Sequence, residues 1–550
     1  MPNQTLNSER AKINVAHILT RNAELYPDRV AIDDRLSKRK LTYAELDQRV
    51  TGLARGLLDL GVGSGDVVAV MLYNEYAMVE AMMACARIGA IFAPLNVRWI
   101  ASEVASYANF HQSKAFITRE EMFACMADVT APVRIVRSEN SLPEGATHDY
   151  EALIARSKRE VIPVETSLEE PFRLIPSGGT TGASKGVVHS HVGTYFTVLS
   201  NIAEFGVGRF WDTIMIAPAY HGAGIDWGML PVMWRAGTVV FPASTSFDPE
   251  DFIKQVRERS IEFLLLVPAV IEAIYRAWDG APIEAPKVVI ATSAPTPPAV
   301  RRKLAEIFPN ANLMAGAGIS ESVNMIIQSP GEFLEYPTSA GQPHLDTRLL
   351  ILDNEDRKVA TGKPGEIALR GFNTALCYNG NPEAGAATWR KRKNDPEGLE
   401  WCFTGDIGIM DADGRVSIVD RSKDIILTGG ETVPSVEVES AYFDSPDVGD
   451  CAAVGLQDDR WGEAITLVVV KHDKSLSDEH LAQSLFDYGR SCLSPYKVPK
   501  QIAFLDVLPR SHFGKILKNK LREHPYDCIH RPAAAVSLEA SAAKSNLNTV

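Results

Sequence analysis

The sequence predicts an α/β protein, with a large N-terminal domain of mixed and parallel sheets flanked by helices and a small α+β C-terminal domain. The chain has 550 residues, of which 45% are apolar and 23% charged, so it is long enough for more than one domain. Helix and strand patterns alternate along its first third. The pattern changes near residue 420, after a stretch rich in glycine and turn residues.

Helix signals and apolar runs predict the individual elements. Thr42 and Glu45 have the spacing of a capping box, and apolar residues with helical periodicity follow them. Gly61 can end this helix, and a second helix, rich in methionine and alanine, is expected to end near Gly89. Short apolar runs predict buried strands at 67–72 (VVAVML), 263–268 (FLLLVP) and 288–291 (VVIA). Because strands alternate with helices, we expect largely parallel sheets.

The change near residue 420 predicts the domain boundary. After it we expect a helix over 434–443, a strand over 467–471, a helix near Leu481 and a strand near Ile502. The last residues contain few large apolar side chains and are expected to be disordered. The predicted organisation is a large domain over 1–420, a boundary at 421–424, a small domain over 425–530 and a tail over 531–550.

Composition excludes several classes of protein. The net charge of −13 argues against a groove for nucleic acid or a site for an anionic membrane surface. No run of about 18 apolar residues predicts a membrane span, and the first residues lack the pattern of a secretory signal. Seven cysteines without a CxxC pair predict neither a disulfide framework nor a structural zinc site, and they fit a reducing cytoplasm.

The segment IPSGGTTGASKGVVHSH, residues 175–191, has the composition of a phosphate-binding loop. Its glycines let the backbone N–H groups approach an anion, its threonines add hydroxyl donors, and Lys185 adds a positive charge. It is not the loop of nucleoside triphosphatases, because Gly186 rather than serine or threonine follows Lys185, and Ser184 rather than glycine precedes it. From composition alone, a flexible surface hairpin explains this segment equally well.

Seven segments resemble, in order, the motifs of the adenylate-forming (ANL) superfamily, in its branch of acyl-CoA synthetases or AMP-dependent acid–CoA ligases. Together they span nearly the whole chain, from about Asn22 to Arg522. They are SGGTTGASKG (177–186), AGAGISE (315–321), GEIALRG (365–371), WCFTGD (401–406), DRSKDIILTGGETVPSVEVE (420–439), LQDDRWGE (456–463) and LPRSHFGKILKNKLR (508–522).

The resemblance implies a site for ATP and Mg²⁺. Glu321 would bind Mg²⁺ together with Thr180, Asp406 would accept hydrogen bonds from the ribose hydroxyls, and Arg421 would reach the ribose or a phosphate. Without the resemblance, a solvated carboxylate, a turn residue and a salt-bridge residue would explain Glu321, Asp406 and Arg421. The implied nucleotide-binding residues are Ser177, Gly178, Gly179, Thr180, Thr181, Gly182, Lys185, Ala294, Gly316, Ala317, Ser320, Asp406 and Arg421.

The resemblance also implies a mobile small domain that carries the catalytic lysine. Lys515 would bridge the carboxylate and the α-phosphate while the adenylate forms. Lys423 would be the hinge residue about which the small domain rotates before the second half-reaction. Gly429 and Gly430 would then line the path of the CoA thiol.

Several positions concern the acid substrate. The segment APAYHGAG, 217–224, resembles the part of CoA ligases with a gating histidine, here His221, which is also a candidate catalytic residue. A Phe-Asp pair typical of amino-acid adenylation is absent. Asp226 could recognise a hydroxyl of the acid, but we expect it to face solvent or to have a structural role. These features favour a fatty, aryl or alicyclic acid over an α-amino acid. The expected pocket residues are Tyr220, His221, Ile225, Trp227 and Ala315.

The chain departs from the motifs of the family at the adenine site. Ala317 replaces an aromatic residue and Ser320 replaces a threonine. Either ATP binds more weakly, or the vacated volume admits a larger acid; the small residues 315–317 favour the larger acid. Residues 292–295 (TSAP) replace a Gly-Gly-Ala-Pro run, and we expect backbone contacts at Ala294 to survive this change.

The resulting hypothesis is a cytoplasmic acid–CoA ligase that uses ATP, Mg²⁺ and CoA and forms acyl-CoA, AMP and diphosphate through an acyl-adenylate. A stand-alone adenylating enzyme that loads a separate carrier protein is the first alternative. A non-catalytic nucleotide- or acyl-binding relative is the second alternative. The resemblance also suggests a homodimer, and we expect neither nucleic acid nor a membrane as partner.

Overall fold

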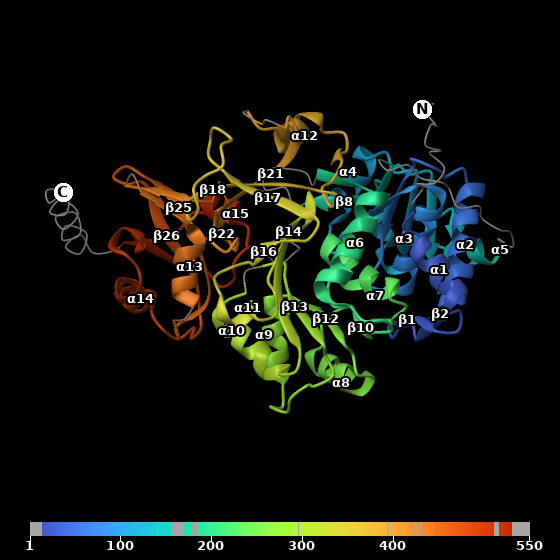
Figure 1. Cartoon of the computed structure of the whole chain (residues 1–550), viewed down its shortest axis with the longest axis horizontal. Helices are drawn as coiled ribbons and strands as arrows, with labels where there is room; N and C mark the ends of the chain where they lie inside the picture. Colours follow the sequence, from blue (N-terminus) through green and yellow to red (C-terminus); the bar gives the residue numbers. More distant parts are fainter. Residues whose placement is uncertain are drawn as a thin grey trace, which may run out of the picture. The chain divides into compact units, whose positions relative to one another are not determined.

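The computed structural model describes residues 14–139, 141–156, 170–177, 185–294, 296–393, 395, 397–421, 424–429, 431–443, 445–510 and 516–530. Its contacts divide the chain into two units (Figure 1). The first, the large unit, comprises the described residues of Met1–Leu350, Ala368–Thr404 and Asp411–Val416. The second, the small unit, comprises those of Ile351–Ile367, Gly405–Met410 and Ser417–Val550. Ile351–Ile367 and Gly405–Met410 thus belong to the small unit by their contacts, although both precede the predicted hinge. The boundary at 421–424 stays a prediction.

The large unit contains an eight-stranded sheet in the order β19-β9-β8-β4-β3-β5-β6-β7. The strands β8, β4, β3, β5, β6 and β7 pair in parallel with their neighbours, as the alternation of strands and helices predicts. In contrast, β9 is antiparallel to both of its neighbours, β8 and β19. The strands are β3 (Val67–Met71), β4 (Ile91–Pro94), β5 (Ala115–Arg119), β6 (Val133–Arg137), β7 (His148–Asp149), β8 (Pro171–Ser177), β9 (Lys185–Ser190) and β19 (Cys377–Tyr378).

A nine-stranded sheet in the order β16-β15-β14-β13-β12-β10-β11-β1-β2 is the second sheet of the large unit. Its strands β12, β13 and β14 are parallel, and β15 returns antiparallel to β14. The buried strands predicted at 263–268 and 288–291 are β12 and β13. The strands are β1 (Val30–Asp34), β2 (Arg39–Thr42), β10 (Thr213–Ile214), β11 (Val239–Phe241), β12 (Phe263–Leu266), β13 (Val288–Ala291), β14 (Asn312–Ile319), β15 (Ser322–Ile327) and β16 (Gln342–Pro343).

Helices flank these sheets, and their caps agree with the sequence. Thr42 and Glu45 form both hydrogen bonds of a capping box at the start of α2, and Gly89, with φ 71°, ends α3. The helices are α1 (His17–Leu25), α2 (Tyr43–Asp59), α3 (Tyr76–Ile88), α4 (Ala101–Phe110), α5 (Tyr150–Arg156), α6 (His191–Phe205), α7 (Leu230–Trp234), α8 (Pro249–Arg259), α9 (Pro268–Ala277), α10 (Pro298–Ile307), α11 (Glu332–Glu335) and α12 (Pro382–Thr388).

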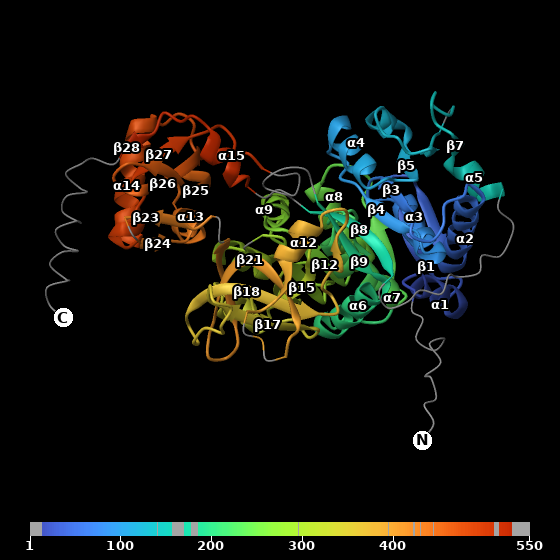
Figure 2. The ribbon, with the colours of Figure 1, turned by 90° about the horizontal axis from the view of Figure 1, so that it is seen from above.

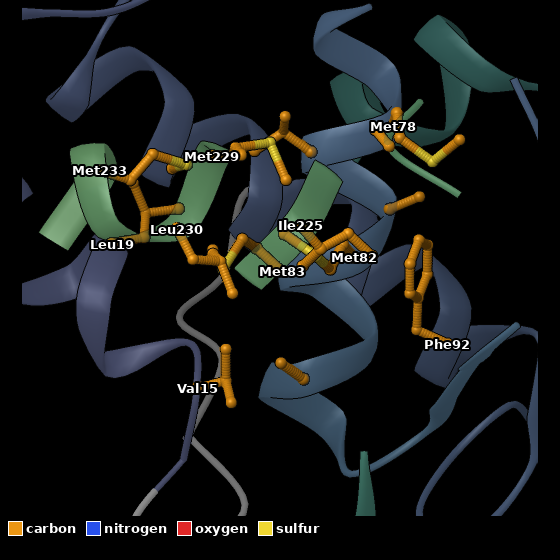
Figure 3. Packing of buried hydrophobic residues seen from close by; sticks show 14 of the residues in the cluster. Val15, Leu19, Met78, Met82, Met83, Phe92, Ile225, Met229, Leu230 and Met233 are labelled. Carbon is orange, nitrogen blue, oxygen red and sulfur yellow. The ribbon is translucent and has the colours of Figure 1, made fainter. Parts of the chain in front are cut away.

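The largest hydrophobic cluster joins both sheets of this unit. All 13 residues of α3 are buried, and apart from Glu80 and Arg87, which form ion pairs with Arg49 and Asp47, its residues are apolar or aromatic. Figure 3 shows its methionines Met82 and Met83 near Ile225, and Met78 belongs to the same cluster. Unbranched methionine side chains fill the irregular gaps between such elements.

The small unit has a six-stranded sheet in which β24, β23, β26, β27 and β28 follow one another and β25 pairs with β26 (Figure 2). The helices and strands predicted after residue 425 are confirmed as α13, β26, α14 and β27. The elements are β23 (Ile426–Thr428), β24 (Glu431–Val433), α13 (Ser435–Phe443), β25 (Val448–Asp458), β26 (Gly462–Lys471), α14 (Asp478–Cys492), β27 (Gln501–Phe504), α15 (Lys518–Glu523) and β28 (Ile529–His530).

A further sheet contains β17, β18, β21 and β20 in this order, with β22 beside β21. All seven cysteines are free thiols, as the sequence predicts. Within the described ranges, no helix combines the length and apolar character that crossing a membrane requires. The strands of this sheet are β17 (Thr347–Leu352), β18 (Pro364–Gly371), β20 (Trp389–Lys391), β21 (Glu400–Met410) and β22 (Val416–Arg421).

Candidate active site

The predicted phosphate loop connects two antiparallel strands. β8 ends at Ser177 and β9 begins at Lys185, and these two residues lie opposite each other in the register. The loop residues in the predicted ATP site lie outside the described residues, so their role stays a prediction: Gly178, Gly179, Thr180, Thr181 and Gly182. The two described ends nevertheless fix where the loop leaves and re-enters the sheet.

A tight turn between β14 and β15 positions Glu321. Ile319 pairs with Ser322 across the two strands, so Ser320 and Glu321 form the connection. The Nε2 atom of His189, on β9, lies 2.9 Å from the carbonyl oxygen of Ser320. A carbonyl only accepts, so Nε2 donates this hydrogen bond. Burial, and secondarily the charge of Arg173, lowers the pKa of His189 to about 3, so the imidazole is neutral. β9 thus holds the turn next to the phosphate loop.

Tyr378 on β19 joins Lys185 to Glu321. Its hydroxyl donates to Oε1 of Glu321 at 2.6 Å. The Nζ atom of Lys185 lies 4.6 Å from the centroid of the Tyr378 ring, a cation–π contact. The structure therefore brings two predicted site residues together through a third that sequence reasoning missed. No local pattern marks Tyr378, because only the pairing of β19 with β9 places it here.

The small residues of β14 pack closely against the protein interior. A Cβ atom on Gly316 would lie 2.5 Å from Cη2 of Trp227, so the indole leaves room only for glycine. The hydroxyl of Thr292 donates to the carbonyl oxygen of Gly316 at 2.9 Å. Ala315 is buried, whereas Ala317 is half-buried. Of these positions, Ala317 is therefore the more accessible to a ligand.

The segment after His221 folds as a short π-helix, η3 (Ala223–Met229). Such π-helical turns are frequent at functional sites. Tyr220 is buried, and its ring lies 4.8 Å from the half-buried imidazole of His221. Burial raises the pKa of Tyr220. His221 and Tyr220 thus lie at the start of this turn, where the sequence predicts the acid-binding segment.

Two of the expected pocket residues lie in the hydrophobic core. Ile225 is 0% exposed and Trp227 is 1% exposed. Figure 3 shows Ile225 beside Met82 and Met83 of α3, and Nε1 of Trp227 donates to Oδ1 of Asn324 at 2.8 Å. Both side chains therefore pack in the core of the large unit, and their role in lining the acid pocket stays a prediction.

Asp226 forms a fully buried ion pair. Its oxygens accept from the guanidinium of Arg173 at 2.7 and 2.5 Å, and the two side chains are 0% and 1% exposed. The structural role that we expected is confirmed, and the alternative of a solvent-facing carboxylate is wrong. Its partner Arg173 lies 53 residues away on β8, a distance that no local pattern spans.

The segment after β13 presents Ser293 and Ala294 at the surface of the large unit. Ser293 has φ 71°, in the left-handed region that favours glycine. The backbone therefore keeps a conformation suited to glycine at a position where the family motif has one. We interpret this as retention of the adenine-binding loop shape, which leaves the prediction for backbone contacts at Ala294 in place.

Asp406 and Arg421 meet within the small unit. Nε of Arg421 lies 3.1 Å from Oδ1 of Asp406, and the side chains are 41% and 8% exposed. Asp406 lies on β21 and Arg421 ends β22, which are neighbouring strands. Because the arginine is partly solvated, this pair can separate or turn toward a ligand at little cost.

Among the residues predicted for the hinge and the thiol path, only Gly429 is described. It has φ 60°, its N–H donates to the carbonyl of Trp461 at 2.8 Å, and a Cβ atom would lie 3.1 Å from the Trp461 ring. Glycine therefore satisfies both a backbone and a packing requirement there. Lys423, Gly430 and Lys515 lie outside the described residues, and their roles stay predictions.

The described residues fit a magnesium ion that enters with a nucleotide. In the part of the chain that the structure describes, no three His, Cys, Asp or Glu side chains gather as a metal site. Mg²⁺ usually binds through one or two carboxylates together with substrate phosphates, so Glu321 alone is a sufficient protein anchor.

Comparison with protein families identifies both parts of the chain. Residues 19–379 match the family described as AMP-binding enzyme, and residues 437–515 match AMP-binding enzyme C-terminal domain. The chain belongs to the AMP-binding enzyme family. The predicted membership of the adenylate-forming superfamily and the predicted fold class are thereby confirmed.

Curated relatives of this AMP-binding enzyme include a feruloyl-CoA synthase from Amycolatopsis sp, 31% identical over 507 residues, which cover 91% of this chain and 97% of the relative. Another is an indoleacetate–CoA ligase from Aromatoleum aromaticum, 30% identical over 519 residues, covering 92% and 97%. Among solved structures, an O-succinylbenzoate coenzyme A synthetase from Bacillus subtilis, in complex with ATP and magnesium ion, has a TM-score of 0.78. That chain is 24% identical, with 92% of this chain and 98% of that chain covered.

Proposed function

We propose that this AMP-binding enzyme is an acid–CoA ligase, which converts a carboxylic acid, ATP and CoA into acyl-CoA, AMP and diphosphate. The observation that carries the proposal is the meeting of Lys185 and Glu321 at Tyr378, where the predicted phosphate loop rejoins β9. A cation and a carboxylate at one loop suit a nucleotide that arrives with its metal ion. The relatives named above act with CoA by their names, which supports CoA as acceptor.

The large unit supplies the groups for nucleotide binding. Lys185 and the loop residues Thr180, Thr181 and Gly182 bind the β- and γ-phosphates, and Ser177 lies where the loop begins. Glu321, together with Thr180, would hold Mg²⁺, whose positive charge would offset the negative charge of the phosphates. Gly316, Ala317, Ser320 and Ala294 border the adenine.

The small unit supplies the remaining groups. Asp406 accepts hydrogen bonds from the two ribose hydroxyls, and Arg421 turns toward the ribose or a phosphate. Lys515 stabilises the negative charge while a carboxylate oxygen attacks the α-phosphorus and the bond to diphosphate breaks. The small domain then rotates at Lys423. The CoA thiolate, which passes Gly429 and Gly430, attacks the carbonyl carbon, and the bond to AMP breaks.

We further propose an aryl-bearing acid as substrate within the wider class of fatty, aryl and alicyclic acids. The names of the relatives indicate ferulic and indoleacetic acids. His221, Tyr220 and Ala315 lie in the segments that would contact the acid. Ala317 replaces a large side chain by a small one, which leaves volume for a ring.

A single assay tests this function. The purified protein is incubated with ATP, Mg²⁺, CoA and a mixed pool of fatty, aryl and alicyclic acids, and CoA thioesters are detected by mass spectrometry. The expected result is an aryl-CoA thioester. A fatty or alicyclic thioester would keep the ligase and remove the aryl preference, whereas AMP without any thioester would favour loading of a carrier protein.

Replacement of the catalytic lysine provides the control. Lys515→Ala is expected to reduce adenylate formation by about a hundredfold or more, because one electrostatic group at the reacting atoms contributes this much. The same variant should still convert a supplied acyl-adenylate to thioester. Adenylate formation at the parent rate would remove Lys515 from the mechanism. No turnover and no ATP binding by the parent protein would favour the non-catalytic alternative.

A further inference from the structure

The extended segment 374–379 connects the two parts of the candidate active site through its backbone. The N–H group of Ala375 donates to the carbonyl of Glu321 at 2.9 Å, and that of Asn379 donates to the carbonyl of Gly186 at 2.9 Å. One short segment is thus hydrogen-bonded both to the turn that presents the carboxylate and to the strand that begins at the loop lysine. Tyr378 lies on this segment.

The Tyr378 hydroxyl is a fixed donor to the carboxylate. The side chain is buried, and the hydroxyl lies 2.6 Å from Oε1 of Glu321. A carboxylate oxygen only accepts hydrogen bonds, so the Tyr378 hydroxyl is the donor. The ring of Trp389 packs edge-on at 4.8 Å between centroids and restricts how the phenol can turn.

The ring of Tyr378 holds the lysine by a separate contact. The ammonium nitrogen of Lys185 lies 4.6 Å from the ring centroid. The hydroxyl of Tyr378 contacts Glu321 and its ring contacts Lys185. Tyr378 therefore holds the ammonium group and the carboxylate close to each other without a direct ion pair between them. Glu321 has two carboxylate oxygens, and the one bound to Tyr378 fixes the orientation of the other.

We propose that Tyr378 is a positioning residue that orients Glu321 for a divalent cation brought by ATP, and that its ring holds Lys185 for the phosphates. The inference rests on the proposed function, and it adds a residue that lies outside the seven motifs quoted above. Groups that hold a metal ligand by a hydrogen bond typically change metal affinity by about 10- to 100-fold when they are removed.

Calorimetric titration of ATP tests this role without turnover. The dissociation constant of ATP is measured once with Mg²⁺ and once with a chelator, and the ratio of the two values gives the stabilisation by the metal. Tyr378→Phe removes the hydroxyl and keeps the ring, so we expect the ratio to fall about tenfold while ATP binding in chelator stays near the parent value. Tyr378→Leu also removes the ring, so ATP binding in chelator should weaken as well.

Tyr275→Phe is the matched control. The Tyr275 hydroxyl also donates to a glutamate, Oε2 of Glu306 at 3.1 Å, but on the exposed surface of α9 and α10. Its removal should leave both dissociation constants unchanged. A Tyr378→Phe protein with the parent ratio would overturn the inference, and a tenfold fall in Tyr275→Phe would do the same.

Tyr378→Phe could also lower the ratio of the two dissociation constants by disturbing the local fold. A double-substitution cycle with Glu321 separates this effect from the positioning role. With Glu321→Gln in place, Tyr378→Phe should no longer change the ratio, since the group that Tyr378 orients is gone. An equal fall in both backgrounds would contradict the positioning role. Failure of the proposed function has a different signature, because the parent protein would then bind no Mg²⁺ and ATP or form no thioester.

Discussion

Two aspartate–arginine pairs in this protein have the same chemistry and opposite surroundings. Asp226 and Arg173, in the large unit, are 0% and 1% exposed and form two hydrogen bonds. Asp406 and Arg421, in the small unit, are 8% and 41% exposed and approach to 3.1 Å. A buried pair is locked because separating it would leave a charge without water, whereas a partly solvated pair can exchange its partner. The first pair is therefore suited to stability and the second to binding a ligand.

The largest expected effect comes from breaking the buried pair. Asp226→Asn keeps the size of the side chain but leaves the Arg173 guanidinium buried without a counter-charge, so we expect a loss of about 3–5 kcal/mol in the free energy of unfolding. Chemical denaturation followed by circular dichroism measures it. Asp406→Asn in the same assay should change the free energy by less than about 1 kcal/mol. Equal losses in the two variants would show that exposure does not separate these pairs.

Next in size is the effect of the accessible pair on nucleotide binding. Asp406→Asn removes a charged acceptor for the ribose hydroxyls, and we expect ATP to bind about 10- to 100-fold more weakly. Calorimetry with ATP and Mg²⁺ measures this change. Tight ATP binding by Asp406→Asn would mean that the carboxylate serves only its arginine, as Asp226 does.

A smaller effect on ATP affinity is expected at Ala317, where the family motif has an aromatic residue. Ala317→Tyr restores a ring next to the predicted adenine site, and we expect the binding of ATP to strengthen by about 1 kcal/mol or roughly fivefold. The same ring should narrow the range of acids that form thioesters. If the acid range and the affinity for ATP are both unchanged, Ala317 does not border the ligands, and accessibility alone would be a poor guide to the site.

The smallest expected effect is a change in the free energy of unfolding caused by backbone strain at Ser293. Ser293 is exposed with φ 71°, a conformation that glycine adopts more easily. Ser293→Gly should raise the free energy of unfolding by about 0.5–1 kcal/mol, because relief of the left-handed strain exceeds the added freedom of the unfolded chain. Thermal unfolding measures the change. A destabilised variant would indicate that the serine side chain makes a contact that outweighs its backbone strain.

Much of the fold follows from local sequence. The capping box at Thr42, the glycine end of α3 at Gly89 and the apolar runs of β12 and β13 are all where the sequence predicts them. These features depend on hydrogen bonds and periodicities within a few residues, which a single sequence displays directly.

The candidate site was only partly predictable. The motifs predict functional roles for Lys185, Glu321, Asp406 and Arg421. The family comparison confirms the family, and these roles stay predictions. The pocket roles of Ile225 and Trp227 stay predictions, since an apolar residue near a predicted site can face either the ligand or the core, and both residues are buried. Only burial in the folded chain separates these two cases.

The motifs assign this protein to its class without a structure, because they are short runs whose chemistry can be read from the order of their residues. Tertiary structure alone decided the pairing of Tyr378 with Glu321, separated by 57 residues, and that of Arg173 with Asp226, separated by 53. The register of the paired strands brings these distant residues into contact. That register depends on which faces of segments far apart in the sequence become buried together. The same burial leaves the Asp226–Arg173 pair without solvent, whereas the guanidinium of Arg421 in the second pair stays 41% exposed.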